Sequence, residues 1–351
     1  MAAQHDLDGF VDDFARRLNT GPPALQVNEP YDPQGLTVNR SVELKEEDAL
    51  SALILNLDAS ARLEQQVTIA HVNGFSGQAT VVITKRDFVE SRLNDHKPDF
   101  VGISEVKNQR EDGEAGILGL LGNRDGPFGY LSRKFFGNDS RTFEYLIHGW
   151  DTSKYIIDGS NGPVENRIDS TMPPGLESPW GYGHRYIWTR LVSKTDSTKT
   201  FILVTCHMPT QRIQRIKVPD AWRGLMKFIE TQNKNGVPIL LMGDTNRSWK
   251  PPRRVPRQGN IYNTVTLQDV LGENPENPYP HLALDVASIQ GDIADFATTE
   301  NSHIDNFIFF YKDGKEHNDD FQKKYRVHYH RLGWTTHHVL VFKFNKSLLE
   351  Y

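Results

Sequence analysis

Short apolar runs bounded by turn residues dominate the chain from Gln66 onward. They are rich in β-branched and aromatic residues, which is typical of strands that are buried on both faces. The runs are Val67–Ala70, Phe100–Ile103, Tyr145–Ile147, Tyr186–Trp188, Phe201–Thr205, Pro238–Met242, Ile304–Phe310 and Val339–Phe342. Two longer amphipathic stretches between them, Lys85–Asn94 and Pro219–Lys234, predict helices. The pattern therefore predicts a layered α/β domain built on a sandwich of sheets over residues 66–346.

The first 65 residues follow a different pattern, with apolar residues at helical spacing. In His5–Asn19 these residues are Leu7, Phe10, Val11, Phe14 and Leu18, and in Ser41–Arg62 they are Leu50, Leu53, Ile54 and Leu57. Ser41 is suited to cap the second helix at its N-terminus. We therefore predict a helical N-terminal extension over residues 1–65, which either packs on the main domain or offers a surface to a protein partner.

Composition places the chain among globular proteins. Of its 351 residues 37% are hydrophobic and 24% are charged, and no apolar run approaches the ~18 residues of a membrane span. The single cysteine, Cys206, excludes an intramolecular disulfide and favours a reducing compartment. The N-terminus has neither the basic end nor the apolar stretch of a secretory signal, so we expect an intracellular protein. A net charge of −5 argues against a protein that coats nucleic acid by overall charge.

Polar side chains follow or interrupt six of the apolar runs. They are Asn73, Glu105, His207, Asp244 with Asn246, Asp305, and the group Thr336–His338. One such residue would be explained by a turn or a helix cap, but several near one core are costly unless they satisfy each other or a ligand. Carboxylates, amides and imidazoles together suit the binding of a hard cation and acid–base chemistry.

In their order and residue types these motifs resemble those of the endonuclease/exonuclease/phosphatase superfamily, which has the deoxyribonuclease I-like fold. The matching segments are Asn73, the strand ending in Glu105, the strand ending in His207, Gly243–Asn246, Ile304–Phe307, and Thr336–His338 in place of Ser-Asp-His. The resemblance implies a four-layered α/β sandwich. It also implies hydrolysis of a phosphate ester that depends on Mg²⁺ or Mn²⁺.

The resemblance further implies a role for each residue. Glu105 would hold the metal, and Asn73 would steady a metal ligand or a phosphate oxygen. Asp244, aided by Asn246, would orient or deprotonate the attacking water. Asp305 would orient the terminal histidine, and that histidine and His207 would stabilise charge on the phosphoryl oxygens. Glu144 lies one position away from the carboxylate that pairs with a histidine in this superfamily.

The last motif allows two alignments. Either Thr336 replaces the aspartate of Ser-Asp-His and His337 is catalytic, or His337 replaces it and His338 is catalytic. We prefer the second alignment, because it keeps the spacing to the strand that follows. Both alignments lack a carboxylate, which predicts either a weakened site or a preference for Mn²⁺ over Mg²⁺.

Basic residues follow two of the strand ends. They are Arg212, Arg215 and Lys217 after His207, and Arg247, Lys250, Arg253, Arg254 and Arg257 with Trp249 after Asn246, while Arg185 precedes another strand. These residues favour a nucleic-acid substrate, with DNA slightly preferred over RNA. Three hypotheses remain open: a metal-dependent nuclease, a phosphatase or phosphodiesterase acting on an inositol-lipid headgroup or another small phosphate ester, and a catalytically silent scaffold. The basic segments could also be only solvated loops.

Overall fold

The computed structural model describes residues 36–38, 42–57, 65–72, 75–81, 84–107, 114–122, 128–136, 143–158, 186–208, 218–234, 236–246, 284–286, 305–310, 321–330, 337 and 339–349. The chain divides into two compact units. The larger unit comprises Tyr31–Arg62 and Thr84–Tyr351, and the smaller unit comprises Met1–Pro30 and Leu63–Ile83. Each unit is described separately.

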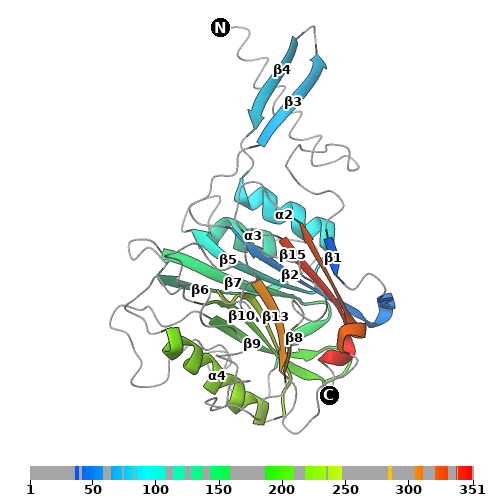
Figure 1. Cartoon of the computed structure of the whole chain (residues 1–351), viewed down its shortest axis with the longest axis vertical. Helices are drawn as coiled ribbons and strands as arrows, with labels where there is room; N and C mark the ends of the chain where they lie inside the picture. Colours follow the sequence, from blue (N-terminus) through cyan, green and yellow to red (C-terminus); the bar gives the residue numbers. More distant parts are fainter. Residues whose placement is uncertain are drawn as a thin grey trace, which may run out of the picture. The chain divides into compact units, whose positions relative to one another are not determined.

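Two mixed sheets form the larger unit (Figure 1). In spatial order the first sheet consists of β1 (Leu36–Val38), β14 (Tyr325–His330), β15 (Val339–Asn345), β2 (Ala49–Asn56), β5 (Phe100–Lys107), β7 (Phe143–Asp151) and β6 (Phe128–Phe136). The second consists of β12 (Leu284–Val286), β13 (Asp305–Phe310), β11 (Ile239–Asp244), β10 (Thr200–His207), β9 (Tyr186–Ser193) and β8 (Tyr155–Ile157). The pairs β2–β5 and β10–β11 are parallel, and the other neighbouring strands are antiparallel.

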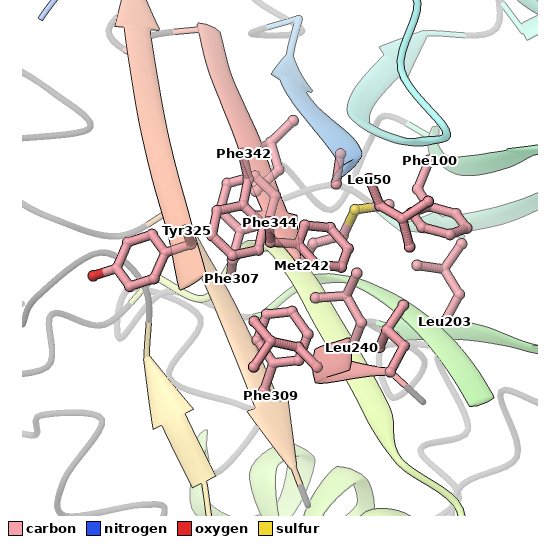
Figure 2. Close-up of a cluster of buried hydrophobic side chains, with 14 of the residues drawn as sticks. Leu50, Phe100, Leu203, Leu240, Met242, Phe307, Phe309, Tyr325, Phe342 and Phe344 are labelled. Carbon is pink, nitrogen blue, oxygen red and sulfur yellow. The ribbon is translucent and has the colours of Figure 1, made fainter. Parts of the chain in front are cut away.

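The inner faces of the two sheets meet in one apolar core (Figure 2). The first sheet contributes Leu50, Phe100, Tyr325, Phe342 and Phe344, and the second contributes Leu203, Leu240, Met242, Phe307 and Phe309. Stacked and tilted rings, among them Phe307 against Phe342, fill the space between the sheets. The core therefore holds the two sheets face to face and brings their strand ends together at the edges of the sandwich.

Helices cover the outer faces of the sandwich (Figure 1). They are α2 (Lys85–His96), α3 (Glu114–Gly122) and α4 (Val218–Lys234), with short 3₁₀ turns η1 (Glu46–Asp48), η5 (Phe321–Lys324) and η6 (Lys346–Leu348). In α4, Leu225, Met226 and Ile229 are buried against the outer face of the second sheet. In α2, the Thr84 side chain caps the helix by accepting a hydrogen bond from the Asp87 N–H. The predicted four-layered α/β sandwich is confirmed.

Residues 41–62 are a correction to the sequence prediction. We predicted a helix there, but Ala49–Asn56 forms β2, which lies between β15 and β5 in the first sheet. All its residues from Leu50 to Asn56 are buried, and the apolar residues Ala52–Leu55 face both sides of the sheet, so the run lacks the alternation that would mark a strand. The sandwich thus begins before residue 66, and the predicted boundary at residues 65 and 66 is wrong. The helix predicted over residues 5–19 lies outside the described residues.

The smaller unit contains a β-hairpin of β3 (Gln65–Val72) and β4 (Phe75–Val81). The two strands pair only with each other in the part of the chain that the structure describes, and the register shifts between Ile69 and Val72. The predicted strand at Val67–Ala70 is confirmed, but it forms this separate hairpin and not a strand of the sandwich. Among the described helices, none is long and apolar enough to cross a membrane.

Candidate active site

Strand ends from both sheets bring carboxylates and imidazoles together at one edge of the sandwich. The first sheet supplies Asn56 from β2, Glu105 from β5 and Glu144 from β7. The second sheet supplies His207 from β10, Asp244 from β11 and Asp305 from β13. The parallel pairs β2–β5 and β10–β11 place the carboxyl ends of their strands at the same edge. Apart from Asn56, these are residues that the sequence predicts to gather, and the structure brings them together.

His207 lies at the centre of this cluster. Its Nε2 is 3.7 Å from Asp244 Oδ2 and 3.8 Å from Glu105 Oε1, and its Nδ1 is 3.9 Å from Glu144 Oε2. The side chains of His207 and Asp244 are only 1% and 2% exposed, whereas that of Glu105 is 16% exposed. A cation or a phosphate would therefore reach the cluster from the side of Glu105.

Asn56 is a site residue that sequence reasoning missed. Its Nδ2 donates to Glu105 Oε1 at 3.1 Å and to Asp244 Oδ2 at 3.4 Å, so one amide links carboxylates from the two sheets. Asn73, to which we had assigned the role of steadying a metal ligand or a phosphate oxygen, lies outside the described residues, between β3 and β4 in the sequence. The signal for Asn56 was present, because it is the polar residue that ends an apolar run, but the assignment of that run to a helix concealed it.

Two residues of the site have backbone conformations that are unusual for residues other than glycine. Glu105 has φ 56° and Asn246 has φ 50°. Glu105 lies where the β5–β7 register shifts between Ile103 and Val106, and a bulge of this kind re-aims a side chain. Asn246 donates its backbone N–H to Asp244 Oδ1 at 2.8 Å and its Nδ2 to the Met208 carbonyl at 2.6 Å. The two strained backbone positions are therefore those that direct the Glu105 carboxylate and hold the Asp244 carboxylate.

Gly243 allows β11 to approach β10 closely just before Asp244. Its φ is +125°, and a Cβ atom there would collide with the Cys206 backbone oxygen. We expect Gly243→Ala to lower the free energy of unfolding by at least about 2 kcal/mol, measured by urea denaturation. Gly122→Ala is the control, because its Cβ would meet only the ring of Tyr130, which is 42% exposed and can move. Equal stability of the two variants would contradict this explanation.

Asp305 binds His337, which decides between the two alignments of the last motif. Nδ1 of His337 is 2.8 Å from Asp305 Oδ2, and its Nε2 is 3.8 Å from Asp244 Oδ2. Both side chains are buried. We had preferred His338 as the partner of Asp305, but the described partner is His337, and His338 lies outside the described residues. The preferred alignment is therefore corrected by one residue, and Thr336 stands where the superfamily has aspartate.

The clustering of carboxylates shifts two pKa values. Burial and the neighbouring Asp305 carboxylate raise the pKa of Asp244 well above its ordinary value, although His337 and the Asn246 N–H act in the opposite direction. Burial lowers the pKa of His337, but the charge and hydrogen bond of Asp305, with Asp244 and Glu105, outweigh it and raise that pKa to about 10. The metal-free cluster thus stabilises a protonated His337.

This shift has a testable consequence for the metal-free protein. A histidine whose folded pKa is raised stabilises the fold fully below its unfolded pKa of 6.5 and loses this contribution as pH rises towards about 10. Histidine side-chain NMR should show His337 still protonated at about pH 8, and Asp305→Asn should lower its pKa. A titration of His337 near its ordinary pKa in the wild type would contradict the assignment.

Among the residues that the structure describes, two groups of side chains could hold a metal ion. The first is Glu105, His207 and Asp244, and the second is Asp244, Asp305 and His337, with donor atoms within 4.8 Å of one another in each group. In the second group a donor atom of Asp305 and one of His337 are already joined by a hydrogen bond. Both groups have two carboxylates and one imidazole, which suit Mn²⁺, and Mg²⁺ through the oxygens. The first group fits better, because Glu105 leaves it partly exposed.

The other predicted site residues fall into two sets. Glu144 is 5% exposed and lies beside His207, as the resemblance implied. Outside the described residues lie all six residues predicted to bind substrate, namely Arg185, Arg212, Arg247, Trp249, Arg253 and Arg254. The geometry therefore brings Glu105, Glu144, His207, Asp244, Asp305 and His337 together, and the roles of these residues and of the substrate-binding set stay predictions.

Among solved structures the chain is similar to an endonuclease/exonuclease/phosphatase from Beutenbergia cavernae, with 14% identity, a TM-score of 0.51, and coverage of 85% of this chain and 72% of that chain. The chain has the endonuclease/exonuclease/phosphatase fold. It is also similar to truncated Caenorhabditis elegans TDP2, with 10% identity, a TM-score of 0.49, and coverage of 86% of this chain and 100% of that chain.

The human Nocturnin catalytic domain with bound sulfate is another similar structure, with 12% identity, a TM-score of 0.47, and coverage of 93% of this chain and 99% of that chain. No protein-family model and no curated protein sequence matches the chain. At 14% identity the similarity to the Beutenbergia cavernae protein establishes the endonuclease/exonuclease/phosphatase fold and leaves the activity to be argued from the site.

Proposed function

We propose that the protein is a divalent-metal-dependent phosphodiesterase, most specifically a nuclease. The observation that carries this proposal is the buried group Glu105, His207 and Asp244, whose donor atoms lie within 4.8 Å of one another at one edge of the fold. Buried carboxylates in such proximity are costly unless a cation or a proton balances them, so the arrangement favours a ligand-binding role over a structural one. Mg²⁺ and Mn²⁺ are the cations that this donor set suits.

Each residue has a role that follows from its position. A divalent cation bound at Glu105, with His207 and Asp244 in reach, would neutralise charge that develops on the phosphoryl oxygens. Asp244 would accept a proton from the attacking water or orient it, and the Asn246 N–H and Asn56 amide hold its two oxygens in place.

The His337–Asp305 pair completes the proposed mechanism. Because Nδ1 of His337 is engaged by Asp305, the imidazolium would offer its Nε2–H to a phosphoryl oxygen or to the leaving group. The same bond fixes the orientation of the ring, so His337 is the catalytic group and Asp305 its positioning residue.

A nucleic-acid substrate is favoured by the basic residues on either side of the catalytic motifs. Five basic residues and Trp249 follow Asn246 within residues 247–257, a stretch without any acidic residue. Arginine and lysine contact phosphates along a strand, and an aromatic ring can stack on a base. DNA is proposed in slight preference to RNA.

The test is a substrate panel with Mg²⁺ or Mn²⁺. Supercoiled plasmid, single-stranded RNA and inositol phosphates are incubated with wild type and with the matched variant Glu105→Gln. Cleavage of plasmid or RNA by wild type alone supports the nuclease proposal. Release of phosphate from inositol phosphates alone would replace it with a phosphatase, and no reaction with any substrate would favour a catalytically silent scaffold.

The basic segment itself is tested through salt dependence. Replacing Arg253, Arg254 and Arg257 by glutamine should weaken DNA binding and flatten the plot of log K against log salt by about 0.9 for each lost phosphate contact. Lys194 and Lys199 form the control, because they lie in the β9–β10 turn at the end of β10 opposite His207. An unchanged slope in the arginine variant would show that the segment is only solvated.

A further inference from the structure

A buried histidine joins the two sheets below the candidate active site. His148 lies on β7 of the first sheet and is 0% exposed. Its Nε2 is 2.7 Å from Thr189 Oγ1 on β9, and its Nδ1 is 3.3 Å from Thr205 Oγ1 on β10. Since β9 and β10 belong to the second sheet, one imidazole spans the space between the two layers.

The neutral imidazole of His148 can satisfy both contacts. One ring nitrogen carries a proton and donates, the other accepts, and each threonine hydroxyl can take either role. Burial lowers the pKa of His148 to about 3, so the ring is uncharged at neutral pH. An apolar side chain of similar size could fill this space, but only directed hydrogen bonds fix one arrangement of the two sheets.

Gly102 makes room for this contact. It lies opposite His148 in the β5–β7 register. A Cβ atom at Gly102 would lie 3.0 Å from Thr205 Cγ2 and 3.4 Å from its Oγ1, which is closer than ordinary packing for the methyl group. The absence of a side chain at this position therefore lets Thr205 approach the first sheet.

The hydrogen-bonded bridge formed by His148, Thr189 and Thr205 lies further inside the sandwich than the candidate active site. On β10, Thr205 precedes His207 by two residues, and on β7, Glu144 precedes His148 by four, so each pair shares one face of its strand. His207 Nδ1 and Glu144 Oε2 are 3.9 Å apart, although the two residues belong to different sheets. Backbone ladders fix positions within a sheet, so the approach of these two residues depends on side chains that connect the sheets.

We propose that His148 is a positioning residue: by bonding Thr189 and Thr205 it fixes β10 against β7 and thereby sets the approach of His207 to Glu144 and Glu105. The proposal rests on the proposed function only in so far as these residues act in catalysis. Its geometric part, that His148 controls the separation of His207 and Glu144, stands without it.

Three variants disturb the bridge in different ways. His148→Phe fills the space without hydrogen bonds, Thr205→Val removes one partner at nearly constant volume, and Gly102→Ala leaves all partners in place but pushes Thr205 away. His148→Gln, which can donate and accept, is the rescue variant. Phe344→Leu is the control for lost packing, because Phe344 lies in the core at the far end of β15 from His337.

Crystal structures of these variants test the geometric part. We expect the distance between His207 Nδ1 and Glu144 Oε2 to exceed the 3.9 Å of the wild type in His148→Phe and Thr205→Val, and to be unchanged in Phe344→Leu. An unchanged distance in both bridge variants would overturn the proposal, even if the protein hydrolyses nothing. Should His148→Phe fail to fold, Thr205→Val still provides the answer.

Kinetics and metal binding test the consequence for the site. kcat should fall by about tenfold or more in His148→Phe with KM little changed, because a small misplacement of catalytic groups is costly, and His148→Gln should recover part of the loss. Mn²⁺ affinity, measured by calorimetry, should fall as well, since the cluster of Glu105, His207 and Asp244 spans both sheets. If kcat and Mn²⁺ affinity in His148→Phe match those of Phe344→Leu, His148 is merely a packing residue and the proposal fails.

Discussion

Replacing Asp244 with asparagine is expected to lower kcat by at least about a hundredfold and, in the metal-free protein, to raise the free energy of unfolding. The loss of activity follows because the change removes a carboxylate that lies close to both imidazoles, 3.7 Å from His207 Nε2 and 3.8 Å from His337 Nε2. The gain in stability follows because the pKa of Asp244 is raised by burial and by Asp305, which means that its ionised form is costly in the fold. Single-turnover kinetics and urea unfolding in a chelator measure the two effects.

A fall in kcat together with a rise in the free energy of unfolding would distinguish a functional carboxylate from a structural one. Asp158→Asn is the matched control, because Asp158 is also buried but is 2.8 Å from the Arg190 guanidinium and supports the fold. That variant should lose stability and keep its kcat. If Asp244→Asn is instead destabilised and active, the assignment of Asp244 to the site is wrong.

The second large effect is expected at His337. Its replacement by alanine should lower kcat by about a hundredfold or more, because it removes the imidazolium held by Asp305. His338→Ala should remain close to wild type, and Asp305→Asn should fall between the two since it leaves the ring in place but alters its protonation. Steady-state kinetics of the three variants, with circular dichroism to confirm folding, measure this order.

The reverse order would restore the alignment that the structure corrects. If His338→Ala is the inactive variant and His337→Ala is nearly normal, the hydrogen bond between His337 and Asp305 has no catalytic meaning. In that case His337, and not Thr336, would stand where the superfamily has aspartate.

The strand ends of the candidate site could be predicted from the sequence because a polar residue follows or interrupts the apolar run in each of them. Glu105, His207 and Asp244 were found in this way, and the structure brings them together. Runs of this kind are buried on both faces, so a polar terminal residue stands out against them. The order of the motifs along the chain then gave the fold, which the comparison with solved structures confirms.

Burial on both faces is also the reason why β2 was not recognised as a strand. Its residues from Leu50 to Asn56 are all buried, and the apolar run Ala52–Leu55 within it is too short to carry a period that separates strand from helix. Asn56 was lost with it. Sequence could not supply the bulge that turns Glu105 towards Asn56, because it depends on pairing with a strand about 40 residues away.

The choice between His337 and His338 could not be made from spacing alone. The two alignments differ by one position, and both put a histidine close before the strand Val339–Asn345. Only the position of Asp305 on β13 settles which imidazole is bound. The bridge from His148 to Thr189 and Thr205 could not be predicted from the sequence either, because it joins three strands from two sheets.

The most direct test of the proposed metal-dependent phosphodiesterase is removal and return of the metal. The nucleic-acid cleavage rate of the purified protein is measured after treatment with a chelator, and again after Mn²⁺ or Mg²⁺ is restored, beside Asp244→Asn under identical conditions. The rate should vanish with the chelator, return with the metal in wild type, and stay absent in the variant. A rate that survives the chelator, or that is the same in Asp244→Asn and wild type, would contradict the proposal.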